Sequence, residues 1–237
     1  MVERPAIRRD TASRTETARA RVLTQLHPAL ASRYTALVAA VAHRVEAGLA
    51  PTVAANRLAF ASVSPPVVAL APWRTERAAF ATRLAAMARR APCLVFADVR
   101  DCYATIRPEV VRASLLGLGC AAPAADGVAR FLRSLRGRGV SGLPVGPGAS
   151  AVLANAVLAR LDGALADAHV PHLRWVDDVV AVPPDLDAAA AVLAIVRETL
   201  AAAGLELNER KTRVVPDPRS LSGTGTVSIA RGRTPVG

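Results

Sequence analysis

The chain has 237 residues, of which 52% are hydrophobic and 21% charged, so it is long enough to fold around one core or two small subdomains. Its apolar runs stay below the roughly 18 residues of a membrane span, and its Arg-rich start lacks the apolar segment of a secretory signal, so we expect no membrane partner. The net charge of +11 predicts a polyanionic partner such as nucleic acid, with a basic solubility surface as the alternative.

The first 90 residues predict a mostly helical region with one strand. Helices are expected over 15–48, with a break near His27 and Pro28, and over 75–90, where Thr75 fits an N-cap. A strand is expected over 53–63, ended by Ser64 and two prolines. Residues 1–14 are polar and are not expected to form regular structure.

From residue 93 onward, short apolar runs alternate with amphipathic stretches. Strands are expected over 93–97, 172–176, 179–182 and 213–215, and helices over 108–118, 149–168 and 187–203. An Arg-rich loop broken by glycines is expected over 130–139. This order predicts an α+β fold in which a split βαβ antiparallel sheet carries helices on one face.

Two adjacent carboxylates, Asp177 and Asp178, interrupt an apolar, β-branched run. Neighbouring aspartates repel each other and are costly to desolvate unless a cation compensates them. A pair of divalent metal ions is one such compensation, and an exposed hairpin turn is the alternative. The predicted strand order places Asp98, at the end of the first strand, beside this hairpin, so three carboxylates should converge at one edge of the sheet.

Four segments in chain order resemble the palm motifs of reverse transcriptases. They read A-D-V-R-D-C-Y-A-T-I (97–106), G-L-P-V-G-P-G-A-S-A-V-L-A-N (142–155), W-V-D-D (175–178) and G-L-E-L-N-E-R-K-T (204–212). Each segment alone is weak, whereas four in order at family-like separations are specific. The resemblance implies a polymerase palm over 91–216, preceded by a helical fingers region over 1–90 and followed by a short flexible tail over 217–237.

The resemblance also implies the chemistry of the site. Asp98, Asp177 and Asp178, with the backbone carbonyl of Val99, would bind two Mg²⁺ ions, for which Mn²⁺ is a possible substitute. Lys211 would protonate the leaving pyrophosphate or neutralise its charge. It is the single lysine among 30 basic residues, and a lysine pKa can be tuned where that of arginine cannot. A surface lysine is the alternative.

Further contact residues are expected within the same motifs and among arginines outside them. For the incoming nucleotide the candidates are Tyr103, which would exclude a 2′-hydroxyl, and Gly146, Ser150 and Arg57. For the nucleic acid they are Pro144, Asn155, Arg133 and Arg136. Each has a structural alternative: Tyr103 as a core aromatic, Ser150 as an early-helix polar residue, Asn155 as a buried polar tie between helix and strand, and the arginines as solvated surface.

We therefore expect an RNA-directed DNA polymerase that takes an RNA template, a DNA or RNA primer, and deoxynucleoside triphosphates. The L-P-V-G-P variant of the second motif resembles bacterial abortive-infection and defence-associated enzymes, which suggests anti-phage defence. The alternatives are template-independent or protein-primed nucleotide addition, and a non-catalytic RNA-binding module with a palm fold. The thumb of such polymerases is expected to be absent or truncated, and a protein partner or self-association to replace it. Three cysteines without a C-x-x-C pair predict a reduced, cytoplasmic setting.

Overall fold

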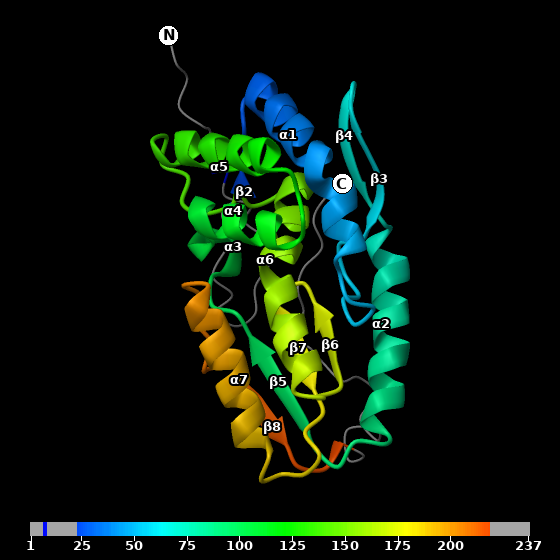
Figure 1. The fold of residues 1–237 in the computed structure, drawn as a ribbon. Coiled ribbons are helices and arrows are strands. Elements are labelled where there is room, and N and C mark those ends of the chain that lie inside the picture. Colours follow the sequence, from blue (N-terminus) through cyan, green and yellow to red (C-terminus); the bar gives the residue numbers. More distant parts are fainter. Residues whose placement is uncertain (1–6, 9–22, 219–237) are drawn as a thin grey trace.

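The structure is a computed structural model that describes residues 7–8 and 23–218. Its first part holds two short paired strands, β1 (Ile7–Arg8) and β2 (Leu23–Thr24), then the long helix α1 (Pro28–Ala47). A hairpin of β3 (Leu58–Val63) and β4 (Pro66–Leu70) follows and lies beside α1, and α2 (Trp73–Ala88) completes this part (Figure 1).

The second part contains the sheet and its helices. β5 (Leu94–Asp98) leads into the single-turn helix α3 (Cys102–Thr105), and then come α4 (Pro108–Gly117), α5 (Ala122–Arg136) and α6 (Gly148–Asp167). The hairpin of β6 (His172–Trp175) and β7 (Asp178–Ala181) is followed by α7 (Ala189–Ala202) and β8 (Arg213–Val215). These four strands form an antiparallel sheet in the order β6-β7-β5-β8, which confirms the α+β fold with a split βαβ sheet.

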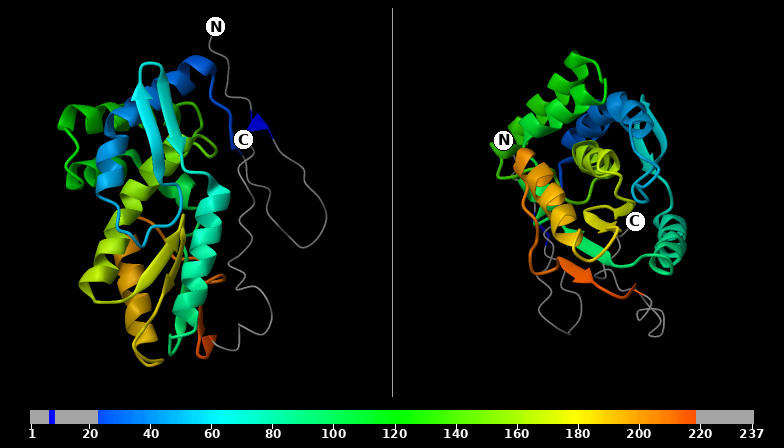
Figure 2. Two further views of the ribbon diagram at one scale, coloured as in Figure 1. Left: turned by 90° about the vertical axis from the view of Figure 1, so that its right-hand side faces the viewer. Right: turned by 60° about the horizontal axis from the view of Figure 1, so that its bottom comes forward.

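The two faces of this sheet pack against different helices. Side chains alternate along a strand, so Val95 and Ala97 of β5 join the main core, whereas Leu94 and Phe96 join a second cluster with Phe80 and other residues of α2. Helices α6 and α7 lie on one side of the sheet and α2 on the other (Figure 2). Asp98 has the same parity as Phe96, so its side chain points to the face opposite α6 and α7.

Helix α6 runs through the centre of the molecule, between α1, α4 and α7 (Figure 1). By length and composition it is the one helix in the described part of the chain that could cross a membrane, but most of it is buried inside the protein. A run this apolar was not expected from the sequence. Residues 149–158 are buried on every side, as in a core helix, whereas the stretch from Arg160 onward also has exposed residues.

Three expectations for the elements need correction. The helix expected from residue 15 begins only at Pro28, because Thr24 lies in β2 and donates its N–H to Val145 O (2.8 Å); residues 15–22 lie outside the described part. Residues 66–70 form a strand, since the prolines make the hairpin turn and do not end the sheet. Residues 122–136 form helix α5, although the sequence analysis expected a loop from residue 130.

Residues on both sides of the predicted boundary at residue 90 share one hydrophobic core. Tyr34 and Val38 of α1 belong to the same buried cluster as Leu153 and Leu158 of α6. The division into fingers and palm stays a prediction. The predicted tail lies outside the described residues from position 219 on.

Candidate active site at the edge of the sheet

The carboxylates of Asp98 and Asp178 lie side by side on neighbouring strands. The two residues are directly opposite each other in the β5–β7 ladder, and Val99 donates its N–H to the carbonyl of Asp177 (3.3 Å). Asp98 and Asp178 are therefore a non-hydrogen-bonded pair, whose Cα atoms typically lie about 4.5 Å apart with both side chains on one face. The predicted meeting of Asp98 with the Asp-Asp hairpin is thus present in the fold.

Asp177 belongs to the two-residue turn that joins β6 to β7. Trp175 pairs with Asp178, so only Val176 and Asp177 connect the strands. Val176 has φ 57°, a left-handed conformation that is unfavourable for a β-branched residue. A positive φ at the first turn residue is what a tight II′ hairpin turn demands. The turn that carries the acidic pair is therefore strained at its first position.

The fourth motif (residues 204–212) contacts Asp98. Asn208 donates its backbone N–H to Asp98 O (2.7 Å) and its side-chain amide to Asp98 Oδ1 (2.7 Å). Lys211 Nζ donates to Asp98 Oδ2 at 2.9 Å. Both carboxylate oxygens of Asp98, which is only 5% exposed, thus have a partner. Asn208 was not among the predicted site residues, although its place in G-L-x-L-N-x-x-K-T was the signal that could have identified it.

The surroundings of Asp178 and of Lys211 shift the pKa of both groups. Burial, followed by the charges of Asp177 and Asp98, raises the pKa of Asp178 to about 7. Burial opposes the charged form of Lys211, but its hydrogen bond and charge interaction with Asp98 prevail, so the pKa of Lys211 is raised. Lys211 is therefore an ammonium ion at neutral pH, and it offsets part of the negative charge at this edge of the sheet.

The donor set suits a hard divalent cation. Carboxylate oxygens are the ligands that Mg²⁺ prefers, and a raised carboxyl pKa shows that the acids would gain from added positive charge. Within residues 7–8 and 23–218, however, no group of three or more His, Cys, Asp or Glu side chains is arranged to hold a metal ion. The two carboxylate oxygens of Asp98 instead accept hydrogen bonds from Asn208 and Lys211.

An open pocket lies against these residues. Its lining combines the two acids with three cations and part of the sheet: Phe96, Ala97, Asp98, Asp178, Val179, Arg210, Lys211 and Arg213. The Arg213 guanidinium lies 4.3 Å from the centre of the Phe96 ring. A site with both acids and cations can accommodate an anionic ligand together with its counter-ions.

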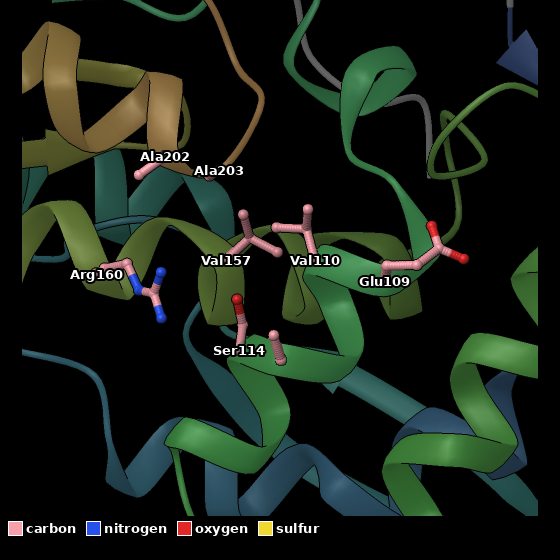
Figure 3. A pocket seen from close by; sticks show the side chains of 8 residues that line it. Glu109, Val110, Ser114, Val157, Arg160, Ala202 and Ala203 are labelled. Carbon is pink, nitrogen blue, oxygen red and sulfur yellow. The ribbon is translucent and has the colours of Figure 1, made fainter.

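A second pocket lies between α4, α6 and α7 (Figure 3). Val110 and Val157 line it together with Ser114, Arg160 and Glu109. Glu109 is the only carboxylate among its lining residues. It therefore lacks the paired acids that distinguish the edge of the sheet.

The first two motifs also meet. Leu143 donates its N–H to the carbonyl of Tyr103 (2.7 Å), and a Cβ on Gly142 (φ 64°) would lie 2.2 Å from that carbonyl oxygen. Only glycine fits there. Tyr103 is half-buried against the main core, Pro144 is buried, and Gly146 is exposed with φ 124°. The nucleotide contacts of Tyr103 and Gly146 and the nucleic-acid contact of Pro144 stay predictions.

Three other predicted contact residues point into the protein. Ser150 is 0% exposed and is hydrogen-bonded to Tyr34 Oη (2.9 Å). Asn155 is 1% exposed and donates to the carbonyls of Ala55 and Asn56. Arg57 binds Glu46 (2.6 Å) and the carbonyls of Ala50 and Val53. The burial of Ser150 and Asn155 agrees with their structural alternatives and offers these two side chains no direct contact with a nucleotide or nucleic acid. Arg57 is partly buried in an ion pair and is not the solvated surface residue of the alternative, and its nucleotide contact stays a prediction.

Arg133 and Arg136 lie on α5, at the opposite end of the molecule from β8 (Figure 1). Both are exposed, and Arg133 donates to Glu109 (3.1 Å). Helix α5 packs on α1 and α4. Their predicted contact with a nucleic-acid backbone stays a prediction.

Comparisons with known proteins identify the family. The family model of the reverse transcriptase (RNA-dependent DNA polymerase) matches residues 29–225. A search of the curated proteins finds no match. Among solved structures, telomerase from Candida albicans, in complex with a TWJ fragment of telomeric RNA, is similar with 16% identity and a TM-score of 0.40, over 60% of this chain and 29% of that one. Because the family model covers well over half of the sequence, the chain belongs to the reverse transcriptase (RNA-dependent DNA polymerase) family.

Proposed function

We propose that this protein is an RNA-directed DNA polymerase whose active site is the sheet edge formed by Asp98, Asp177, Asp178 and Lys211. The family assignment supports the reaction class. The observation that carries the choice of site is the cross-strand pair of Asp98 and Asp178, with Lys211 bound to Asp98. Both acids and the lysine line the same open pocket.

The residues take distinct roles. Asp98, Asp177 and Asp178, with the Val99 carbonyl, would hold two Mg²⁺ ions, or Mn²⁺ in their place. Such ions lower the pKa of the attacking 3′-hydroxyl and stabilise the leaving pyrophosphate. Lys211, kept protonated by its acidic neighbours, protonates the leaving pyrophosphate or neutralises its charge. Tyr103 is proposed to exclude a 2′-hydroxyl from the nucleotide site.

The test is primer extension on poly-rA and poly-dA templates with Mg²⁺ or Mn²⁺. We expect incorporation by the wild-type protein on the RNA template. Asp178→Asn should reduce it by about 10³-fold or more, since losing the charge that holds the cations forfeits several kcal/mol of transition-state stabilisation. Asp178→Asn also removes a carboxylate that opposes folding at neutral pH, so its loss of activity will not reflect unfolding.

Asp101→Asn is the matched control. Asp101 lies three residues from Asp98, is exposed, and has φ 44°, which asparagine also tolerates. It should retain full activity. An Asp178→Asn variant that incorporates nucleotides as well as the wild type would refute the site.

The same assay separates the alternatives. Incorporation without any template would indicate untemplated nucleotide addition, and RNA binding without incorporation would indicate a non-catalytic module. Association with a protein partner or a second copy is proposed as well and is tested by light scattering with primer–template present. We further propose a role in anti-phage defence, which the L-P-V-G-P motif suggests, and a cytoplasmic location, which the cysteine pattern suggests. Survival of phage-challenged cells that carry wild type or Asp178→Asn tests the role in defence.

A further inference from the structure

A fully buried arginine lies directly behind the acidic hairpin. Arg174, in β6, is 0% exposed. Its Nε and Nη2 donate to the carboxylate of Asp162 at 2.7–3.1 Å. Its Nη1 donates to Asn155 Oδ1 (2.9 Å) and to the carbonyl of Val176 (2.8 Å). One guanidinium thus joins helix α6 to the turn that carries Asp177.

The ion pair with Asp162 anchors this guanidinium. A buried arginine is costly unless it is both paired and hydrogen-bonded, and the two-pronged contact with Asp162 meets both conditions. Burial opposes the ionisation of Asp162, yet the charge and hydrogen bonds of Arg174, together with the nearby His172 ring, hold its pKa below the ordinary value. Asp162 therefore stays charged, and Arg174 has one preferred orientation.

The third guanidinium nitrogen of Arg174, Nη1, is hydrogen-bonded to the turn between β6 and β7. Val176 adopts φ 57°, which its β-branched side chain disfavours, and such a conformation persists only where surrounding contacts enforce it. The hydrogen bond from Arg174 to the Val176 carbonyl is such a contact, and it comes from the protein interior. Arg174 Nη1 also donates to Asn155 Oδ1. The Asn155 amide is itself held in place, because its Nδ2 donates to the carbonyls of Ala55 and Asn56.

We propose that Arg174, anchored by Asp162 and Asn155, is a positioning residue that sets the Val176–Asp177 turn and thereby the placement of both hairpin carboxylates. This inference rests on the proposed function for its catalytic consequence. It assigns Asn155 to the support of the active site and not to contact with nucleic acid. None of these three side chains touches substrate, because all three are buried.

The test compares Arg174→Lys with the wild type. A lysine keeps the charge opposite Asp162, but its single ammonium does not reproduce the fork that serves Asp162, Asn155 and Val176 together. We expect kcat to fall on the order of 10- to 100-fold, with KM for the nucleotide within about twofold. The affinity for Mn²⁺, measured without nucleotide from the EPR signal of the free ion, should weaken by a similar factor.

Val128→Ala is the stability control. Val128 is buried in α5, away from the sheet, so its truncation lowers stability without touching the hairpin. It should leave kcat and Mn²⁺ affinity unchanged at temperatures where it remains folded. Equal losses in Val128→Ala and Arg174→Lys would overturn the inference, as would wild-type values in Arg174→Lys.

If Arg174→Lys does not fold, Asn155→Ala is the second variant for the same test. It should lower kcat and leave KM for primer–template unchanged, whereas a rise in that KM alone would overturn the inference by showing direct contact. If the wild type binds Mn²⁺ more tightly than Arg174→Lys but incorporates nothing, the proposed function fails and the positioning role stands. If the wild type incorporates nucleotides and Arg174→Lys matches it, only the positioning role fails.

Discussion

Asp178 should make the protein less stable as the pH rises through neutrality. Its pKa is about 7 in the folded state, against an ordinary value of 3.8. Between those values the folded state binds more protons than the unfolded chain, so the free energy of unfolding falls with increasing pH. Each pKa unit corresponds to about 1.4 kcal/mol, which gives a cost of about 4 kcal/mol at pH 8. This is an upper limit, because Asp98 and Asp177 share the titration.

The variant Asp178→Asn removes this titration and keeps the shape of the side chain. At about pH 5 the ionisation cost in the wild type is less than half of its value at pH 8, because the folded state still retains its proton. The stability of Asp178→Asn relative to wild type should therefore increase by about 3 kcal/mol between pH 5 and pH 8. Taking the difference between two pH values cancels any effect of the amide on packing.

The measurement is urea unfolding at both pH values, followed by circular dichroism in the presence of a chelator. A stability difference between variant and wild type that does not change with pH would refute the proposed crowding of acids at the sheet edge. Adding Mg²⁺ at pH 8 should raise the stability of the wild type more than that of Asp178→Asn, since a ligand that binds only the folded state stabilises it.

Two further substitutions probe the residues that bind Asp98, and two others probe glycines elsewhere in the fold. Lys211→Arg should keep the ion pair with Asp98 and change stability by less than about 1 kcal/mol, but lower single-turnover incorporation by about 10²-fold or more, because a guanidinium does not release its proton. Asn208→Ala leaves Asp98 Oδ1 without its partner and should cost about 1–3 kcal/mol in urea unfolding. Gly142→Ala should lower thermal stability by more than about 2 kcal/mol, because its Cβ would meet the Tyr103 carbonyl at a positive φ; Gly163→Ala, in the open middle of α6, should raise it by about 0.5–1 kcal/mol.

The sheet could be predicted because its strands are short apolar runs with clear boundaries. Strands β5, β6, β7 and β8 each lie within one or two residues of the predicted ranges. Their order follows from the hairpin around Asp177 and from the pairing of β5 with β7. The approach of Asp98 to Asp178 is a consequence of that order, which is why sequence reasoning could reach it.

Helix α5 was missed because its polar residues outweighed a helical apolar pattern. Val128, Leu132 and Leu135 recur at helical spacing and are buried against α1 and α4. The exposed face carries Arg133 and Arg136, and their charge, with the glycines at 137 and 139, suggested a loop. Periodicity was the better signal here, because one apolar stripe is enough to hold a surface helix on the core.

The direction of side chains on α6 could not be predicted for a different reason. Ser150 and Asn155 look like ligand contacts on an amphipathic helix, but the first half of α6, where they lie, is surrounded by other elements and has no solvent face. The pairing of Asp162 with Arg174 joins two elements, and it depends on how α6 lies on β6. The sequence signal for this pairing was weak, because α6 carries Arg160 and Asp167 besides Asp162, and only the fold shows which of these charges is buried and must be paired.

The active-site edge combines features that each oppose folding. Val176 has an unfavourable backbone conformation, and Asp178 is ionised only against burial and two neighbouring charges. Lys211 and Asn208 satisfy Asp98 on one side, and Arg174 holds the turn from the other. Strain and like charges persist at a site where the surrounding structure enforces them. Asp178, whose pKa is raised by burial and by neighbouring charges, would gain from an added cation, so we expect cation binding at this edge to relieve the same repulsion that lowers the stability of the free protein.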